Sequence, residues 1–201
     1  MIGLCAQARM GKDTIADYIV EHNHNWVKHS FAKQLKLLIS TFYNISLEEI
    51  EEFKTSDNVH QNVNMKMRYI LQLVGETFRT ISKDVWVNMA MQNIPMNTNV
   101  IFTDVRYENE MNAITRQHGH LILIGRTKYL INDPHPSEIF LQEAIVWFLE
   151  NTTACIVETQ SLENIPEKFS QYSFFIRNDS SLNELYANLA STLPKILKQN
   201  D

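Results

Sequence analysis

The sequence predicts an α/β fold, a doubly wound parallel sheet flanked by helices, with a helical insertion and a short lid. Three observations lead to this fold class. Short apolar runs with β-branched residues alternate with helical patterns, as in parallel βαβ units. One long stretch that is helical throughout interrupts this alternation. The chain has 201 residues, 44% of them hydrophobic, which is enough for one substantial core, and it has no internal repeat or low-complexity linker.

The first two strands and helices are predicted from the amino-terminal part of the chain. "MIGLC" (1–5) is a short apolar run, and a polar loop separates it from "KDTIADYIVEH" (12–22), whose apolar residues recur at helical spacing. "WVKHSF" (26–31) predicts a second short strand, and "AKQLKLLISTFY" (32–43) predicts a helix.

The helical stretch runs from about residue 46 to 93. It starts at "SLEEIEEF", where Ser46 and Glu49 have the spacing of a capping box. Further helices are predicted in "MKMRYILQLVGETFRTIS" (65–82) and "DVWVNMAMQN" (84–93). Such a stretch indicates an insertion between two strands of the sheet.

The carboxyl-terminal half returns to alternation. "NVIFTDV" (99–105) and "HLILIGR" (120–126) are apolar runs separated by the helical "ENEMNAITRQHG" (108–119). "YSFFIRN" (172–178) predicts another strand, and "SLNELYANLASTLPKILK" (181–198) a last helix. Ligands of such sheets bind at the carboxyl ends of the strands.

We expect one domain over residues 1–201. Its core is predicted to comprise residues 1–45 and 94–201, its helical insertion about 46–93, and its lid about 126–140. The sequence does not fix the number of chains that assemble, and a homodimer is compatible with it.

The charge balance and the cysteines exclude several classes of function. The 18 basic and 23 acidic side chains give a net charge of −5 without a long run of either sign, which disfavours binding to nucleic acid or to an anionic membrane. No apolar stretch approaches the roughly 18 residues of a membrane span. Cys5 and Cys155 lie far apart without metal-ligand spacing. We expect a soluble, cytoplasmic protein that binds anions through local concentrations of charge.

The loop after the first predicted strand retains most of a phosphate-binding loop. The usual pattern is G-x-x-x-x-G-K-[ST], and Gly11, Lys12 and Thr14 keep its second half. Ala6 stands in place of the first Gly, which fits if its φ is negative. Asp13 replaces the hydroxyl residue and could bind Mg²⁺ through water or cap the helix. The alternative is a capped helix after a strand, with a solvated Lys12.

A second candidate site lies on one helix, within "RYILQLVGETFR" (68–79). At roughly 100° per residue, Arg68, Gln72, Gly75 and Arg79 share one narrow stripe. Arg suits bidentate phosphate contact, Gln can bond a base edge, and Gly lets a ligand approach the backbone. The opposite side, which we expect to pack, carries Ile70, Leu73, Val74 and Phe78. The alternative is a solvated face with an incidental glycine.

Further candidates follow two other predicted strands. Asp104 and Arg106 come at the end of one strand, where a carboxylate can organise Mg²⁺ or accept a proton, or where Asp104 can cap the next helix. Arg126 and Lys128 begin a stretch with Pro134 and Pro136 that we interpret as a mobile lid, although a merely solvated loop is an alternative. His135 is interpreted as structural. Trp86 could stack on a base or belong to the core.

Together these stretches resemble the deoxynucleoside monophosphate kinases of bacteriophages, which have the P-loop nucleoside monophosphate kinase fold and are related to phosphomevalonate kinase. The resemblance rests on six motifs, from one end of the chain to the other: "GKDT" (11–14), "HSFAKQLK" (29–36), the R-x-x-x-Q-x-x-G-x-x-x-R helix followed by Trp86, "FTDVRYENE" (102–110), "HPSE" (135–138) and "IRNDSSLNELY" (176–186). In that family Asp follows the loop Lys, as Asp13 does, whereas Ala6 departs from the family's usual Gly.

The resemblance implies ATP-dependent phosphorylation of a deoxynucleoside monophosphate to its diphosphate, with Mg²⁺ as cofactor. The residues expected to bind ATP are Arg9, Gly11, Lys12, Asp13 and Thr14. Those expected at the acceptor nucleotide are Phe31, Lys36, Arg68, Gln72, Gly75, Arg79, Trp86 and Arg106, with Ala32 beside them. Catalysis is assigned to Lys12, Asp104 and Arg126, and Mg²⁺ binding, directly or through water, to Asp13 and Asp104.

Two competing functions stay open. The first is a kinase of the same fold that acts on phosphomevalonate or another phosphorylated metabolite, although Gln72 and Trp86 favour a nucleobase. The second is a nucleotide-binding module without catalysis, which the altered loop makes conceivable. Turnover with a panel of acceptors distinguishes the three.

Overall fold

A computed structural model describes residues 1–56, 58–61, 63, 65–130 and 135–198. The chain divides into two compact units, one formed by residues 1–29 and 95–201 and the other by residues 30–94. We call them the sheet unit and the helical unit. No helix in the described part of the chain is both long enough and apolar enough to cross a membrane.

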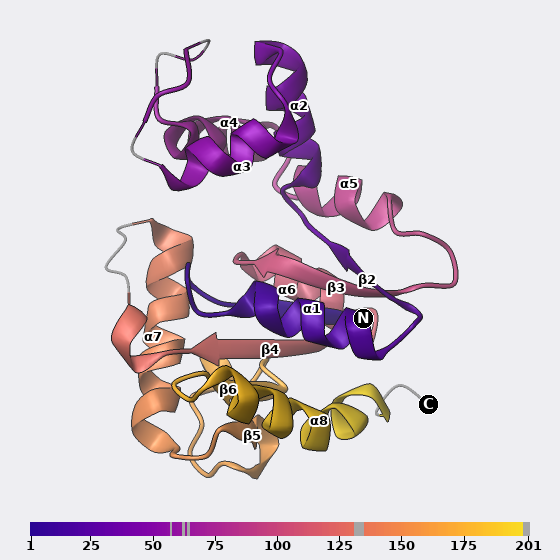
Figure 1. The fold of residues 1–201 in the computed structure, drawn as a ribbon, viewed down its shortest axis with the longest axis vertical. Helices are drawn as coiled ribbons and strands as arrows, with labels where there is room; N and C mark the ends of the chain where they lie inside the picture. Colours follow the sequence, from indigo (N-terminus) through magenta and orange to yellow (C-terminus); the bar gives the residue numbers. More distant parts are fainter. Residues whose placement is uncertain (57, 62, 64, 131–134, 199–201) are drawn as a thin grey trace. The chain divides into compact units, whose positions relative to one another are not determined.

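The described residues of the sheet unit form six strands in the order β2-β3-β1-β4-β6-β5 (Figure 1). The strands are β1 (Ile2–Cys5), β2 (Trp26–His29), β3 (Asn99–Val105), β4 (His120–Gly125), β5 (Ile156–Glu158) and β6 (Phe174–Arg177). All neighbouring pairs are parallel except β5 and β6. This confirms the predicted α/β class and its parallel sheet, and β5 adds an antiparallel edge strand that was not predicted.

Helices cover both faces of this sheet. They are α1 (Lys12–His22), α6 (Glu108–Thr115), α7 (Pro136–Asn151) and α8 (Leu182–Lys198), with short 3₁₀ turns at η1 (Thr127–Tyr129), η2 (Thr159–Ser161) and η3 (Glu167–Phe169). Helices α1 and α8 lie on one face, where the rings of Tyr18 and Tyr186 stack at 4.7 Å, and α6 and α7 lie on the other (Figure 1). Every residue of β1 is buried, as expected for a central parallel strand.

Helix α7 changes the interpretation of the predicted lid. The lid was placed at about residues 126–140, but Pro136 is already the first residue of α7. Leu141, Ala144, Ile145 and Phe148, at helical spacing, are fully buried in the sheet unit. The carboxyl-terminal part of the predicted lid is therefore a packed helix. Residues 131–134, which include Pro134, lie outside the described residues.

The helical unit consists of α2 (Lys33–Tyr43), α3 (Leu47–Thr55), α4 (Met67–Ile81) and α5 (Val85–Gln92). Its core is a single cluster of buried residues: Leu35, Ile39, Ile45, Ile50, Val63, Met67, Ile70 and Trp86. The predicted capping box is confirmed, because Ser46 Oγ accepts from Glu49 N (3.1 Å) and Glu49 Oε2 accepts from Ser46 N (2.7 Å).

The helical unit begins earlier than the sequence suggested. We predicted residues 1–45 for the core, but the division lies between His29 and Ser30. The reason is α2, which contributes Leu35 and Ile39 to the cluster that α3, α4 and α5 share.

Candidate functional site

The loop between β1 and α1 has the backbone that phosphate binding requires. Gly11 precedes α1 in the left-handed region, with φ 89° and ψ 16°. Its N-cap residue makes no side-chain cap hydrogen bond, and a helix end of this kind can offer its first backbone N–H groups to an anion. The alternative of a capped helix receives no support from the N-cap position, because a glycine occupies it.

Two backbone angles in the loop differ in how far they could be predicted. The non-glycine residues with positive φ do not include Ala6, which is buried, so the condition for replacing the first Gly is met. Arg9, an exposed side chain expected at ATP, has φ 65°. A non-glycine residue in this region is uncommon and the sequence does not indicate it.

The side chains of Lys12 and Asp13 form an ion pair, with 2.5 Å between Lys12 Nζ and Asp13 Oδ2. Lys12 is largely covered, with 21% of its side chain exposed, whereas Asp13 has 68% exposed. A polyanionic ligand at this helix end would compete with Asp13 for the ammonium group. Asp13 would then be able to face a cation bound to that ligand.

Strand register brings the other candidates of the sheet unit to the same edge. Cys5 at the end of β1 pairs with Val105 of β3 and with Leu123 of β4, and Gly125 pairs with Arg177 of β6. The carboxyl ends of parallel strands therefore surround the beginning of the loop between β1 and α1 (residues 6–11), the predicted phosphate loop. This confirms that Asp104 and Arg106 occur at the carboxyl edge of the sheet.

Asp104 is half-buried at the end of β3, and the N-cap residue of the next helix is Tyr107. The carboxylate of Glu110 lies at this helix end, where its Oε2 accepts from the backbone N of Arg106 (2.8 Å) and of Tyr107 (3.1 Å). Glu110 is one of the two acidic residues in "ENE", and the sequence analysis gave it no role.

The described residues contain no group of three or more His, Cys, Asp or Glu side chains that could hold a metal ion. Mg²⁺ in phosphoryl-transfer enzymes is usually held by one or two carboxylates, waters and the substrate phosphates rather than by a protein cage. Asp104 beside the loop and Asp13 at the start of α1 are compatible with that kind of binding.

Arg106 contacts a residue that sequence reasoning had given no role. Its Nη1 donates to Oε1 of Glu138 in the first turn of α7, and only 4% of the Glu138 side chain is exposed. The backbone carbonyl of Glu138 also accepts from Nε2 of the buried Gln7, at 3.4 Å. Arg106 was expected at the acceptor, and here it links β3 to α7.

Arg126, the first residue of the predicted lid, directly follows β4 and precedes the turn η1. The next residue, Thr127, donates to Asp179 through its backbone N (2.8 Å) and its Oγ1 (2.5 Å). Burial raises the pKa of Asp179, but the bonds from Thr127 and the Arg177 guanidinium outweigh it and lower the pKa below its usual range. The root of the predicted lid is therefore attached to the segment after β6.

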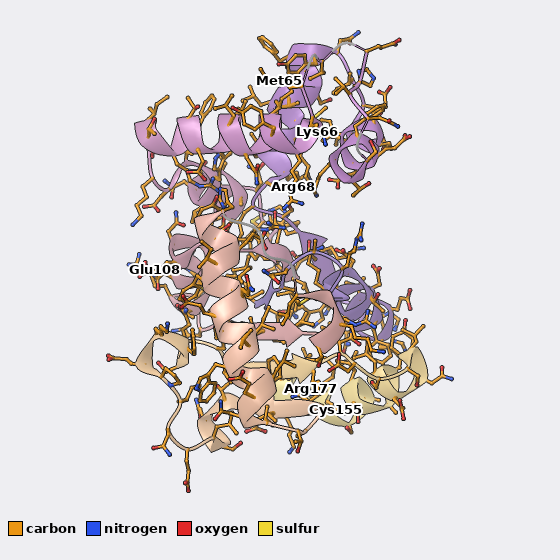
Figure 2. All side chains as sticks on the ribbon, turned by 90° about the vertical axis from the view of Figure 1, so that its left-hand side faces the viewer. Met65, Lys66, Arg68, Glu108, Cys155 and Arg177 are labelled. Atoms are coloured by element: carbon orange, nitrogen blue, oxygen red, sulfur yellow. The ribbon has the colours of Figure 1, made fainter. Side chains whose placement is uncertain are left out.

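In the helical unit, the predicted stripe of α4 is only partly a surface. Arg68 is exposed near the amino-terminal end of the helix (Figure 2), and Gln72 and Arg79 are half-buried. Arg79 Nη1 donates to Glu76 Oε1 at 3.0 Å. Leu73 was expected to pack, but 48% of its surface is exposed. Met67, one turn before Ile70, belongs to the buried cluster instead.

The predictions for Gly75 and Trp86 need correction. Trp86 is 4% exposed in the core of the helical unit, and its Nε1 donates to the carbonyl of Gly75 at 3.1 Å. A Cβ on Gly75 would lie 3.3 Å from Cδ2 of Leu35. The glycine thus admits Leu35 and the indole N–H rather than a ligand, and the indole ring is not offered to a base.

Two acceptor candidates near the beginning of the helical unit are also covered. Phe31 is 2% exposed, so its ring offers almost no surface to a ligand. Lys36 forms an ion pair with Glu51, which also binds Lys54 at 3.1 Å. Partial desolvation raises the pKa of Glu51, but bonds and charge from Lys36 and Lys54 lower the pKa overall. A phosphate at Lys36 would have to displace Glu51.

Comparison with known proteins adds a relative that extends over both units. The chain is 27% identical over 203 residues to a protein of Acanthamoeba polyphaga mimivirus named "Putative deoxynucleotide monophosphate kinase". The alignment covers 91% of this chain and 99% of the viral protein. The chain is thus similar, along most of its length, to a viral protein whose name describes a kinase. No family model matches the chain.

Among solved structures, a dephospho-CoA kinase from Campylobacter jejuni matches over 100% of this chain and 98% of its own, with a TM-score of 0.45 and 14% identity. The sheet unit itself has an α/β architecture. It combines a mostly parallel sheet, helices on both faces and a loop after the first strand that leads into a helix beginning with Lys12.

Proposed function

We propose that this protein transfers the γ-phosphoryl group of ATP to a deoxynucleoside monophosphate and so forms the diphosphate and ADP. The observation that carries the proposal is the uncapped amino terminus of α1, which follows a left-handed Gly11 and carries Lys12. A helix end of this kind stabilises phosphate groups through backbone N–H groups and the helix dipole. The name of the mimivirus relative, "Putative deoxynucleotide monophosphate kinase", supports the choice of acceptor.

The sheet unit would bind the donor. Backbone N–H groups of the loop and the Lys12 ammonium would surround the β- and γ-phosphates, with Arg9, Asp13 and Thr14 at the edge of the loop. Mg²⁺, when bound with ATP, neutralises phosphate charge, and Asp13 and Asp104 would hold it directly or through water. Arg126 would contribute positive charge where the transferred group develops its negative charge.

The helical unit would bind the acceptor through α4. The Arg68 and Arg79 guanidiniums suit the monophosphate, and the Gln72 amide suits a base edge. Phe31, Lys36, Gly75 and Trp86 support this helix or its neighbours from within the unit rather than contact the nucleotide. Arg106, which is bound to Glu138, would order the carboxyl edge of the sheet.

The reaction needs little covalent chemistry from the protein. An oxygen of the acceptor monophosphate attacks the γ-phosphorus of ATP, a new P–O bond forms, and the bond to the ADP leaving group breaks. Catalysis then consists of aligning two anions and dispersing their charge, which a Lys loop and Arg side chains supply.

The test is release of ADP by the purified protein with Mg²⁺, ATP and one acceptor at a time. The panel comprises the four deoxynucleoside monophosphates, the four ribonucleoside monophosphates and phosphomevalonate. We expect turnover with at least one deoxynucleoside monophosphate and none with phosphomevalonate. Turnover of phosphomevalonate alone would assign a small-molecule kinase, and ATP binding without any transfer would assign a nucleotide-binding module.

A further inference from the structure

The segment that follows β6 contacts the phosphate loop through one buried side chain. Asn178 is 5% exposed, and its Nδ2 donates to the carbonyl oxygen of Met10 at 2.9 Å. Its backbone N donates to the carbonyl of Gly125, the last residue of β4, at 2.8 Å. Asn178 is thus anchored to the sheet while its amide group contacts the loop.

The residue before Asn178 fixes the position of this segment from the other side. Arg177 lies beside Cys155 (Figure 2), whose carbonyl accepts from Arg177 N at 2.8 Å. The Arg177 guanidinium donates to the carbonyls of Leu149 and Thr152 at the end of α7, the second at 2.7 Å. These bonds hold the backbone from which the Asn178 side chain extends.

Asn178 also fills the space beside Gly11. A Cβ on Gly11 would lie 2.2 Å from Asn178 Nδ2, a distance that no carbon and nitrogen atom tolerate without a bond. Gly11 is therefore required twice, by its φ of 89° and by the amide group packed against its Cα. The amide of Asn178 takes the place that a side chain at residue 11 would occupy.

The contact fixes the orientation of one loop peptide. The described chain has no cis peptide bond, so the Met10 carbonyl and the Gly11 N–H point in opposite directions. Because Asn178 holds the carbonyl, the Gly11 N–H is directed away from Asn178. A donor fixed in this way loses no orientational freedom when an anion binds.

We infer that Asn178 is a positioning residue for the phosphate loop. Its side-chain amide holds the Met10–Gly11 peptide so that the Gly11 N–H and the amino terminus of α1 are oriented for the phosphates of ATP. This inference rests on the proposed function, because it assigns Asn178 to the donor site of that reaction. Asn178 touches the loop and not the substrate, so its effect is expected in donor affinity.

The test measures the dissociation constant of a fluorescent ATP analogue, which does not depend on turnover. We expect Asn178→Ala and Asn178→Leu, which both remove the donor without adding charge, to raise this constant about tenfold. The KM for the acceptor should stay within twofold of the wild-type value. Thermal unfolding is recorded in parallel to separate loss of fold from loss of affinity.

Asn23→Ala is the matched control. Asn23 Nδ2 donates to the carbonyl of Ile19 at 2.8 Å, which is the same kind of bond at the opposite end of α1. We expect this variant to lower thermal stability without a change in ATP affinity. If Asn178→Ala and Asn178→Leu fold and bind the analogue as tightly as the wild type, Asn178 is only structural and the inference is overturned.

A wild-type measurement decides the case in which both Asn178 variants fail to fold. With asparagine labelled by ¹⁵N, the side-chain resonance of Asn178 should shift when ATP is added, while that of Asn23 should not. An unchanged Asn178 resonance at saturating ATP overturns the inference. If the wild-type protein binds no ATP, the proposed function fails first and the inference falls with it.

Discussion

At the residue scale, the phosphate loop shows which departures from a sequence pattern matter. Ala6 replaces a glycine without strain because its φ is negative, whereas a side chain at Gly11 would be strained by its φ of 89° and would clash with Asn178. A sequence pattern records residue types, but whether a position requires glycine depends on its backbone angle and on the space beside its Cα. The loop pattern therefore fails at Ala6, although the backbone at this position does not need a glycine.

Ala6→Gly is expected to leave ATP affinity unchanged and to lower the free energy of unfolding by about 0.4–1 kcal/mol, because glycine gives the unfolded chain more freedom. Denaturant titration and the fluorescent ATP analogue measure the two quantities. A several-fold gain in affinity would instead mean that the alanine impairs the loop.

His120 gives the protein a pH dependence that can be traced to one side chain. Burial lowers the pKa of its imidazole, the nearby α-amino group lowers it further, and its buried Nε2 lacks a hydrogen-bond partner. Its folded pKa lies below the unfolded value of about 6.5. The unfolded state therefore binds more protons in this range, and stability must fall as the pH drops below the unfolded pKa.

We accordingly expect the wild-type protein to lose stability relative to His120→Gln between about pH 7 and pH 5. Urea unfolding of both proteins at several pH values measures this difference. Parallel curves for the two proteins would show that His120 does not titrate differently in the folded state.

At the element scale, helix α4 has two roles, one in packing and one in the predicted binding of the acceptor. Its buried side closes the core of the helical unit, with Gly75 in contact with Leu35 and its carbonyl bound by Trp86. Its Arg68 end is exposed and carries the predicted acceptor contact. Helical spacing alone could not distinguish the residues of the stripe that pack from those that bind.

Trp86→Phe separates packing from base stacking. Loss of the indole N–H and of ring volume is expected to reduce the free energy of unfolding by about 1–3 kcal/mol, while the acceptor KM stays close to the wild-type value. Enzyme kinetics and denaturant unfolding are compared on the same preparation. A large rise in acceptor KM at unchanged stability would restore Trp86 as a stacking residue.

Arg68→Ala tests the exposed end of the helix. Removing a charge-assisted contact to the monophosphate is expected to raise the acceptor KM about 10- to 100-fold and to leave the ATP KM nearly unchanged. Arg116→Ala, which removes an exposed guanidinium at the end of α6, is the matched control. Equal effects of Arg68→Ala on both KM values would contradict the assignment of α4 to the acceptor.

At the scale of the whole molecule, the sequence predicted correctly those elements that depend on residues close together in the chain. Apolar runs that alternate with helical periods predicted the parallel sheet, and the capping box predicted the start of α3. Helix α7 was not predicted because its own apolar side chains occur around most of its circumference. Neither a single apolar stripe nor a strand pattern is therefore evident in its sequence. The three residues of β5 are too few for any pattern.

The parts of the candidate site that were missed depend on contacts between distant residues. Glu138 reaches Arg106 across 32 residues of sequence, and Asn178 reaches Met10 across 168. Both lie in motifs quoted for the resemblance, "HPSE" and "IRNDSSLNELY", but their partners follow only from strand order. The role of Trp86 likewise became clear only from its burial. The sequence alone cannot distinguish an aromatic residue of the core from one that stacks on a ligand.

Transfer of labelled phosphate tests the central claim most directly. The purified protein is incubated with Mg²⁺, ATP labelled at the γ-phosphate, and a deoxynucleoside monophosphate. We predict that the label appears in the deoxynucleoside diphosphate, that Lys12→Ala reduces this transfer at least about 100-fold, and that Lys28→Ala, an exposed lysine paired with Asp17, does not. Absence of label from every diphosphate, or undiminished transfer by Lys12→Ala, would contradict the account.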